Sequence, residues 1–592
     1  MNRKFALACA AAAVLVVAAY ANSLHNSFHF DDAHVIETNL YLRDLSNIPR
    51  FFTDAHTFSS LPQNATYRPL VTLSLALDYA RGHGLDPAAF HQTQIALLVI
   101  TGALLAAFFT PIAGEWLALL AATLFCVQTA NTETMNLISA RSELLSTIGL
   151  LASFVLYQRS PFARRTLLYL LPLAIGALAK APLVVFAPLL FAYALLFEKQ
   201  PPRKALRIAT PPLLIGIALL AFLNSMNAKE WTSGAGSRLP YLITQPFAWL
   251  HYARLFFLPI GLTADTDWQP FAHWYDTRAV AGYLFVALLV LAIARARPAI
   301  AFGLAWFAVA LLPTSLFPLA EVVNEHRIFF AYIGAVLALV IAIPPRARTA
   351  VMLALIVANT IGTIERNKVW RTEETLWADT VAKAPANGRA WMNYGLTQMA
   401  KGRYAVAKSC FERAALLTPN YSILEINRGV VEGALGDPAS AEQHFRRALA
   451  LNPDANAHFF FARWLVQRGR AAEGLLEVRE AVRMSPAFAE ADDLSRRLDV
   501  ALGRRPGRAW PDYAGAFRDG RAAIDRGDWL AAAEANRDAL RHDRHSADAW
   551  NNLGWSLAQL GLTNEAAHAY EQALAIEPSN DRVRNNLHLL GR

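Results

Sequence analysis

The first 364 residues consist largely of apolar runs separated by short polar loops, whereas the rest of the chain is polar and repetitive. Runs of this length and polarity are typical of helices that cross a bilayer. The chain therefore predicts an all-α protein, with a polytopic membrane bundle of about eleven spans followed by a soluble part. The apolar runs lie at 5–24, 92–110, 115–130, 143–158, 166–179, 181–197, 208–224, 279–294, 298–317, 328–345 and 348–364.

Two of the apolar stretches have alternative interpretations. The run at 5–24 follows Arg3 and Lys4 and could be a signal peptide cleaved before Asn22. Because it is long enough to span and further spans follow, we favour an uncleaved first helix with its N-terminus inside. Residues 241–260 contain prolines and charged residues, which favours an interfacial or re-entrant segment. If they cross the membrane instead, one loop has been placed on the wrong side.

Charged residues separate the two parts of the chain. Asp, Glu, Lys and Arg number 41 up to Ile364 and 60 in the shorter remainder, so we place the boundary near Ile364. Positive residues concentrate in a few short loops, which predicts that those loops are cytoplasmic and that the first polar loop and the soluble part are outside. The net charge of +9 then reflects membrane topology and does not indicate nucleic acid. The basic loops contain Arg159, Arg164, Arg165, Lys199, Arg203, Lys204, Arg207, Arg295, Arg297, Arg346 and Arg348.

The soluble part repeats with a period of about 34 residues. Gly402, Gly436, Gly469 and Gly561 are each followed seventeen residues later by a proline. This is the tetratricopeptide pattern, in which each unit contains two helices and stacks on its neighbours as a solenoid. We divide the chain into a membrane domain at 1–364 with its first outer loop at 25–90, a first repeat block at 365–500, a linker at 501–511 and a second block at 512–592.

The segment FHFDDAHVIETN, residues 28–39, carries two adjacent carboxylates just after the first span. Taken alone, Asp31 and Asp32 fit a solvated loop. However, several other polar residues are predicted to reach the same membrane face, where unpaired charge is costly. They are Arg68, Arg141, Lys180, Glu325, His326 and Arg327. Cations around a carboxylate pair suit a phosphate-bearing donor and a hydroxyl acceptor, because the cations bind the phosphate and a carboxylate takes the proton. A set of structural ion pairs is the competing interpretation.

The order of these motifs resembles a known family. An FxFDD loop is followed by YRPL, TExxxxISxRSELL, LAKxP, NEHRIF and then tetratricopeptide repeats. This arrangement is similar to the transmembrane and tetratricopeptide-repeat protein O-mannosyltransferases and to bacterial relatives in the GT-C glycosyltransferase superfamily. The resemblance covers nearly the whole chain. It implies a polyprenyl-phosphate sugar donor, a Ser or Thr hydroxyl acceptor and repeats on the non-cytoplasmic side.

The resemblance also implies roles for individual residues. One of Asp31 and Asp32 would activate the acceptor, and the other would orient it or bind a divalent cation such as Mg or Mn. Arg68 lies in the YRPL motif, and Arg141, Lys180 and the group from Glu325 to Arg327 match polar positions of the family pattern, with phosphate or sugar contact as their expected work. The chain departs from the family at LAKAP, where Lys180 lacks an acidic neighbour, and this leaves the sugar and any metal open.

The sequence thus predicts a membrane glycosyltransferase that moves one sugar from a lipid-phosphate carrier to a protein hydroxyl, with inversion at the anomeric carbon. We expect a bacterial inner-membrane protein whose periplasmic repeats bind the acceptor polypeptide. Membrane lipid is its other partner. A non-catalytic repeat scaffold for envelope or pilus assembly is one alternative. A ligase that uses a lipid-diphosphate oligosaccharide is another, although its large outer loop would be expected late in the membrane part.

Overall fold

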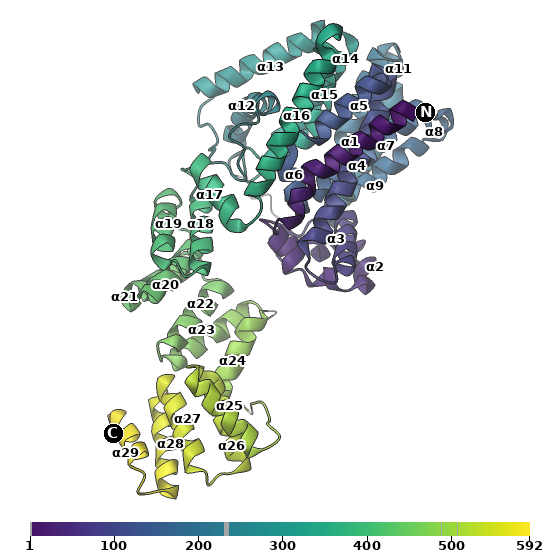
Figure 1. Cartoon of the computed structure of the whole chain (residues 1–592). Helices are drawn as coiled ribbons and strands as arrows, with labels where there is room; N and C mark the ends of the chain where they lie inside the picture. Colours follow the sequence, from purple (N-terminus) through teal and green to yellow (C-terminus); the bar gives the residue numbers. More distant parts are fainter. Residues whose placement is uncertain (1–2, 181, 230–235, 487, 506, 592) are drawn as a thin grey trace. The chain divides into compact units, whose positions relative to one another are not determined.

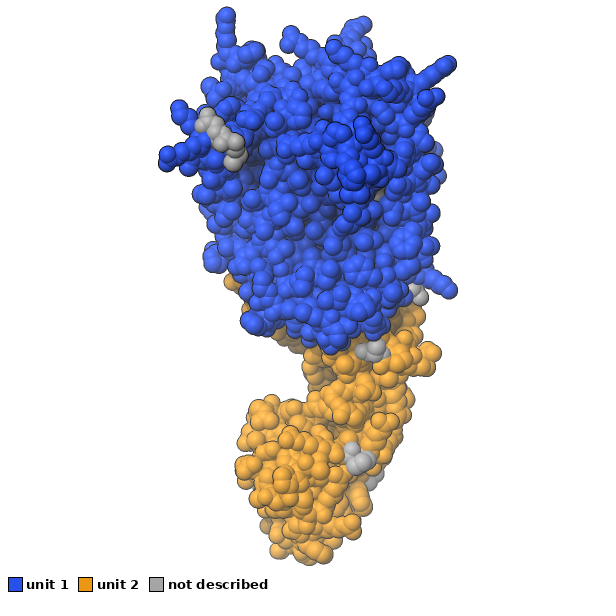
Figure 2. Space-filling model, turned by 90° about the vertical axis from the view of Figure 1, so that its right-hand side faces the viewer, with its two compact units in different colours: residues 1–387 blue, residues 388–592 orange. Residues whose placement is uncertain are grey.

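The computed structural model describes residues 3–180, 182–229, 236–486, 488–505 and 507–591. All regular elements in these ranges are helical, which confirms the predicted all-α class (Figure 1). The chain forms two compact units, Met1–Asn387 and Gly388–Arg592, which Figure 2 shows in different colours.

Unit 1 contains the apolar helices. Asp86 caps the start of α4, and Asp276 caps the start of α13, in each case by accepting a backbone N–H. The α-helices of this unit are α1 Arg3–Tyr20, α2 Ile48–Phe51, α3 Pro69–Arg81, α4 Pro87–Ala113, α5 Glu115–Cys126, α6 Thr132–Asn136, α7 Arg141–Arg159, α8 Pro161–Thr166, α9 Leu171–Ala177, α10 Phe186–Leu196, α11 Pro202–Met226, α12 Arg238–Phe257, α13 Thr277–Arg295, α14 Pro298–Leu316, α15 Ile328–Ala342, α16 Pro345–Val369 and α17 Glu373–Lys383.

Eight helical segments of the described chain are long and apolar enough to cross a membrane. They contain α1, α4, α7, α11, α13, α14, α15 and α16. Three shorter apolar helical segments, at Glu115–Cys126, Leu168–Ala177 and Phe186–Leu196, lie where the other predicted spans were expected. Residues 241–260 fall mostly in α12, which is helical but is not among the eight candidates.

Small residues allow the helices of unit 1 to pack closely. Gly303 of α14 and Gly334 of α15 face each other, and a Cβ added to Gly303 would lie 2.5 Å from the Gly334 carbonyl oxygen. Close backbone approach of this kind is favourable between membrane helices, where dispersion contacts replace the hydrophobic effect.

The candidate site residues and the basic loops lie at opposite ends of shared helices. Helix α7 begins at Arg141 and ends at Arg159, and α15 begins beside His326 and ends shortly before Arg346. At a rise of 1.5 Å per residue, the two ends of α7 are about 27 Å apart. Arg141 and His326 thus lie at one end of these helices, and the basic residues lie at the other.

The boundary between the two units falls after Asn387, later than the predicted boundary near Ile364. Helix α16 continues to Val369, and the next residues pack back onto unit 1. Trp370 and Leu376 share a buried cluster with Leu137 and Ala140, which precede α7. Because this stretch is mostly polar, its composition did not indicate that these two apolar residues pack onto unit 1.

Unit 2 consists of helix pairs, as the repeat pattern predicts. Gly402, Gly436, Gly469 and Gly561 all have φ between 71° and 87°, because each turns the chain between the two helices of a pair. The predicted linker, 501–511, starts at the last residue of α24 and ends before the first residue of α25. The helices are α18 Gly388–Ala400, α19 Tyr404–Leu417, α20 Ser422–Leu435, α21 Pro438–Leu451, α22 Ala455–Gln467, α23 Ala471–Met484, α24 Ala489–Ala501, α25 Tyr513–Asp525, α26 Trp529–His542, α27 Ala547–Gln559, α28 Thr563–Ile576 and α29 Asp581–Leu589.

Candidate active site

The chain turns sharply in the FHFDD segment. Phe30 has a φ of 51°, a left-handed conformation that is uncommon for an aromatic residue. Two backbone hydrogen bonds hold the turn: the Asp32 N–H donates to the His29 carbonyl at 3.0 Å, and the Ala33 N–H donates to the Phe30 carbonyl at 3.1 Å. The turn separates the adjacent carboxylates, so that Asp31 is exposed and Asp32 is buried.

Asp32 is a fully buried anchor. Its Oδ1 accepts the Ser139 N–H at 2.7 Å, and its Oδ2 accepts the N–H groups of His29 and Ile138, each at 3.2 Å. Burial raises the pKa of Asp32 to about 6, although the three N–H donors oppose the shift. Asp32 therefore ties the first outer loop to the segment that leads into α7.

Asp31 presents an open carboxylate. Its side chain is 67% exposed, and Oδ1 lies 3.5 Å from Nε2 of His34. The protein around the carboxylate partly desolvates it, which raises its pKa, but a hydrogen bond from His34 and nearby positive charges outweigh that effect. The net result is a pKa below the ordinary value, so Asp31 is ionised at neutral pH. The charges that act on it belong to His34, His326 and Arg68.

Two further cations come from separate segments of the chain. Arg68 precedes α3, and its guanidinium lies 5.1 Å from the centre of the Phe58 ring. Burial lowers the pKa of Arg68, and the carboxylates of Glu143 and Asp31 counter this. Lys180, which follows α9, forms an ion pair with Glu143 at the start of α7 and remains 29% exposed. Thus Arg68 and Lys180 meet around Glu143, with Arg68 close enough to act on Asp31.

His326 reaches the same region from the residues before α15. Its Nδ1 lies 2.9 Å from Oε1 of Glu133, and 23% of its side chain is exposed. Glu133 is 2% exposed and lies in the segment between α5 and α7. Because Nδ1 is held by Glu133, the Nε2 edge is the one left to face a ligand.

Arg141 is close to Glu143 in the sequence, but its side chain binds other residues. It is fully buried, with Nη1 at 2.6 Å from Oδ2 of Asp78. Its Nε donates to Gln94 at 3.0 Å, and its Nη2 donates to the Phe90 carbonyl at 2.9 Å. These contacts join α7 to α3 and α4, so the geometry favours a structural role for Arg141 over the predicted contact with a donor.

Glu325 and Arg327, on either side of His326, are also buried among protein groups. Oε1 of Glu325 accepts the Thr263 N–H at 2.7 Å. Nη1 of Arg327 donates to the Val322 carbonyl at 3.4 Å. Of the eight predicted site residues, the structure brings four into one electrostatic group, in which Asp31 is exposed and the other three are half-buried, and Asp32 anchors the loop that carries Asp31. The other three are Arg68, Lys180 and His326.

The sequence interpretation missed three partners of these residues. His34 lies beside Asp31, Glu143 pairs with Lys180, and Glu133 pairs with His326. The sequence signal was present, because charged residues beside an apolar helix need partners. The acidic neighbour that Lys180 lacks in the LAKAP segment is thus supplied from α7.

The acidic pair does not form a convincing cation site. Among the residues that the structure describes, no group of three or more His, Cys, Asp or Glu could hold a metal ion. Both oxygens of Asp32 already accept backbone N–H groups, which leaves the Asp31 carboxylate alone. Mg²⁺ and similar ions prefer about six oxygen ligands. The donors therefore do not fit a divalent cation, and we derive no step through one.

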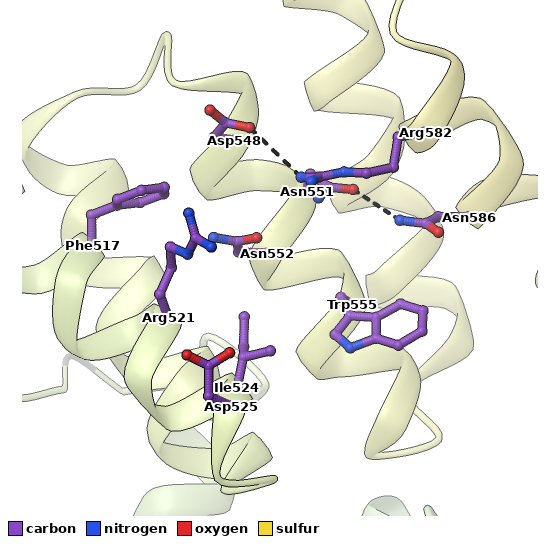
Figure 3. Close-up of a pocket in the computed structure, with 10 residues that line it drawn as sticks. All are labelled: Phe517, Arg521, Ile524, Asp525, Asp548, Asn551, Asn552, Trp555, Arg582 and Asn586. Atoms are coloured by element: carbon purple, nitrogen blue, oxygen red, sulfur yellow. Dashed lines mark hydrogen bonds and ion pairs between the residues drawn. The ribbon is translucent and has the colours of Figure 1, made fainter.

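A second candidate site lies in unit 2, in a pocket of about 380 Å³ formed by α25, α27 and α29 (Figure 3). Asn551 is 4% exposed, and its Oδ1 accepts a hydrogen bond from Asn586 at 3.0 Å. Asp548 and Arg582 form a longer ion pair at 3.7 Å. Arg521 points into the space beside Asn552. The pocket is lined by Phe517, Arg521, Ile524, Asp525, Asp548, Asn551, Asn552, Trp555, Arg582 and Asn586.

Comparison with protein families confirms the repeats. The tetratricopeptide repeat family matches residues 388–421, 426–487 and 547–580. Among solved structures, YrrB, described as a tetratricopeptide protein with an unusual peptide-binding site, is 14% identical and aligns with 35% of this chain and 96% of its own, at a TM-score of 0.21. With the apolar helices of unit 1, the family matches define a multi-pass helical membrane protein that carries tetratricopeptide repeats.

Curated relatives extend the similarity over most of the chain. Protein O-mannosyl-transferase TMTC3 of Homo sapiens is 23% identical over 638 residues, which cover 96% of this chain and 67% of the relative. A protein O-mannosyl-transferase of Caenorhabditis elegans is 23% identical over 433 residues, which cover 69% of this chain and 62% of the relative. The predicted resemblance to these mannosyltransferases is confirmed. The matched region spans about two thirds of each relative's length.

Proposed function

We propose that the chain is a GT-C-type glycosyltransferase that moves a sugar from a polyprenyl-phosphate carrier to a Ser or Thr hydroxyl of a protein. The observation that carries the proposal is the exposed Asp31 carboxylate with Arg68, Lys180 and His326 around it. The similarity to protein O-mannosyl-transferases makes mannose the first sugar to test.

The reaction follows from the charges at this site. Asp31, ionised because nearby cations lower its pKa, accepts the proton of the acceptor hydroxyl. The hydroxyl oxygen bonds to the anomeric carbon as the bond from that carbon to the phosphate oxygen breaks. The polyprenyl phosphate leaves with the electron pair, and Arg68 and Lys180 stabilise its charge. One displacement inverts the anomeric configuration.

Asp32 is a positioning residue in this mechanism. Its two oxygens hold three backbone N–H groups, which fix the turn that presents Asp31. A base acts efficiently only when it is held at the correct distance from the proton that it takes.

We assign binding of the acceptor polypeptide to the repeats. Within the repeats, we assign specific contacts with the acceptor to the pocket that contains Asn551. Side-chain amides can donate to and accept from a polypeptide backbone, and Arg521 offers a cation for an acidic residue of the acceptor. Arg521→Ala should lower the glycosylation of one subset of acceptors by about tenfold, the worth of one charged hydrogen bond. Quantitative glycopeptide analysis would detect this, with exposed Arg526→Ala as the matched control. Equal occupancy in both variants would exclude Arg521 from acceptor binding.

We place the reaction on the periplasmic side of a bacterial inner membrane. The positive loops, which are retained inside, lie at the opposite ends of α7 and α15 from Asp31 and its neighbours. Cysteine accessibility at exposed Asp44 and Arg346 would test this assignment, because only the first of these positions should react with an impermeant reagent added to the periplasm.

The experiment that tests the function is mass analysis of exported proteins from cells that carry the wild-type chain, Asp31→Asn or Asp44→Asn. Asp44 lies in the same loop and is exposed. Its side chain caps a short helix by accepting the Ser46 N–H, and an asparagine side chain at this position can accept the same hydrogen bond. We expect a sugar-sized mass to disappear from some proteins with Asp31→Asn alone. Unchanged masses in all three strains, at equal membrane levels, would favour the scaffold alternative. Loss of a whole oligosaccharide would favour the lipid-diphosphate ligase.

A further inference from the structure

Glu133 and His326 form a buried pair for which the proposed mechanism has no role beyond ligand contact. Oε1 of Glu133 lies 2.9 Å from Nδ1 of His326. The other oxygen of Glu133, Oε2, is buried, and no residue in the described ranges forms a hydrogen bond with it. A carboxylate in this position controls which nitrogen of the imidazole carries a proton.

The charged groups around the pair come from several elements. Lys180 and its partner Glu143 lie close enough to His326 to act on its charge, and so does Asp31 of the first outer loop. Arg366 of α16 acts on Glu133, and so does Glu325. Arg327 acts on both members of the pair. His326 is thus the member of the pair that meets the exposed site, and Glu133 lies behind it.

The burial of Glu133 selects one protonation state of the pair. Burial raises the pKa of Glu133, although Arg366 and Arg327 oppose the shift. The geometry points the same way, because Glu133 is 2% exposed and none of the described residues makes a hydrogen bond to its Oε2, so an ionised carboxylate would leave a charged oxygen buried without a donor. The pair then holds two protons, either as a carboxylic acid beside a neutral imidazole or as a carboxylate beside an imidazolium. In the first form the acid donates to Nδ1, and in the second Nδ1 donates to the carboxylate. In both forms Nε2 carries a proton.

We propose that Glu133 is a positioning residue that keeps the His326 Nε2–H as a hydrogen-bond donor to the phosphate of the lipid carrier. This inference deepens the proposed function and rests on it. His326 then donates a hydrogen bond and transfers no proton: the acceptor proton goes to Asp31, and the phosphate leaves as an anion that the Nε2–H stabilises. Without Glu133, a neutral imidazole can place its proton on Nδ1 and turn a lone pair toward the phosphate, which repels it.

The test uses the full-length protein in detergent and two measurements. The first is the Kd for undecaprenyl phosphate, which carries no sugar, and the second is the rate of sugar transfer. The variants are Glu133→Leu, Glu133→Gln, His326→Leu and the double variant Glu133→Leu with His326→Leu. Glu198→Leu is the matched control, because Glu198 is a paired carboxylate near the other end of α7, bonded to Arg164 and Tyr157.

We expect Glu133→Leu and His326→Leu each to raise the Kd by about tenfold and to lower transfer by a similar factor. The double variant should be no worse than His326→Leu alone, because two residues that act as a unit are not additive. Glu133→Gln keeps a side chain that can donate to Nδ1 and should stay within about threefold of wild type. Glu198→Leu should leave the Kd unchanged.

The inference is overturned if folded Glu133→Leu binds the lipid as tightly as wild type, or if the effects of the two leucine variants multiply. It is also overturned if Glu133→Gln is as weak as Glu133→Leu. A wild-type chain that binds the lipid but transfers no sugar would contradict the proposed function, and the Kd values would still decide whether Glu133 acts through His326. A wild-type chain that neither binds nor transfers would contradict both.

Discussion

The two ends of α7 both carry buried or half-buried charges, but they use them differently. Near the Arg159 end, Arg164 pairs with Glu198 at 2.8 Å, and the Tyr157 hydroxyl donates to Glu198 at 3.1 Å. The Arg164 guanidinium also lies 4.0 Å from the centre of the Tyr157 ring. At that end, positive and negative groups satisfy each other.

At the Arg141 end, the pairing is incomplete on the exposed side. Lys180 pairs with Glu143 and His326 with Glu133, yet Asp31 keeps an exposed carboxylate. The Arg68 guanidinium lies against the Phe58 ring. In a structural network the charged side chains pair with one another, whereas in a site for a charged ligand some charged side chains have no opposite charge beside them. On this contrast we base the proposal of function at the Arg141 end and of stability at the other.

The largest effect should come from removing the charge of Asp31. Asp31→Asn keeps the size of the side chain but cannot take a proton, so the transfer rate should fall by about a hundredfold to ten-thousandfold. Initial rates with purified protein would measure this, together with Asp44→Asn as a control. A rate within threefold of wild type would remove Asp31 from the mechanism.

Removal of Arg68 should have the next largest effect. Arg68→Ala takes away a cation that is poised for phosphate, so transfer should fall by about a hundredfold and the Kd for the lipid phosphate should rise. Arg68→Lys should recover part of the loss, because the charge returns without the planar donors. Arg43→Ala, on the same loop, is the control. If Arg43→Ala were equally damaging, loop stability rather than phosphate binding would explain both.

Asp32 should give the reaction an acid limb. Its pKa is about 6, so below that pH it becomes protonated and one oxygen no longer accepts an N–H. Transfer should therefore fall as the pH drops through about 6. The pKa of Asp32 in the folded protein lies above its ordinary value, so the folded state takes up this proton more readily than the unfolded state. Protonation of Asp32 as the pH falls through about 6 therefore does not lower the free energy of unfolding. A pH profile of the rate, taken beside thermal unfolding, would check this; the limb should be absent in Asp32→Asn.

The smallest effect on transfer should come from the opposite end of α7. Glu198→Gln breaks the ion pair with Arg164, which should lower the free energy of unfolding by about 2 kcal/mol. The transfer rate at a temperature where the protein is folded should stay unchanged. Thermal unfolding and initial rates would separate the two effects. A large fall in the transfer rate of Glu198→Gln would contradict the proposal that this end of α7 serves stability alone.

Much of the fold was predictable because it depends on long, regular patterns. The apolar runs predicted helices in unit 1, and the 34-residue spacing predicted the helix pairs of unit 2. That Gly402 and Gly436 turn the chain between paired helices is known only from their positive φ. The unit boundary lies later than predicted because Trp370, which follows α16, and Leu376 of α17 pack onto unit 1 from an otherwise polar stretch.

The sequence predicted which residues belong to the candidate site better than it predicted how they are arranged. The motifs pointed to Asp31, Lys180 and His326, but the sequence could not tell the exposed Asp31 from the buried Asp32, since that depends on the turn at Phe30. Arg141 looked equivalent to Lys180, and only the three-dimensional contacts with Asp78 and Gln94 distinguish them.

The most direct test of the central claim is sugar transfer by the purified chain from a defined lipid donor. Polyprenyl-phosphate mannose and a lipid-diphosphate oligosaccharide would each be mixed with exported proteins from a strain that lacks the chain. The products would be analysed by intact mass and for anomeric configuration. We predict that the monophosphate donor alone adds one hexose, with inversion, and that Asp31→Asn abolishes the addition. No transfer from either donor by a folded protein that binds the lipid would contradict the account.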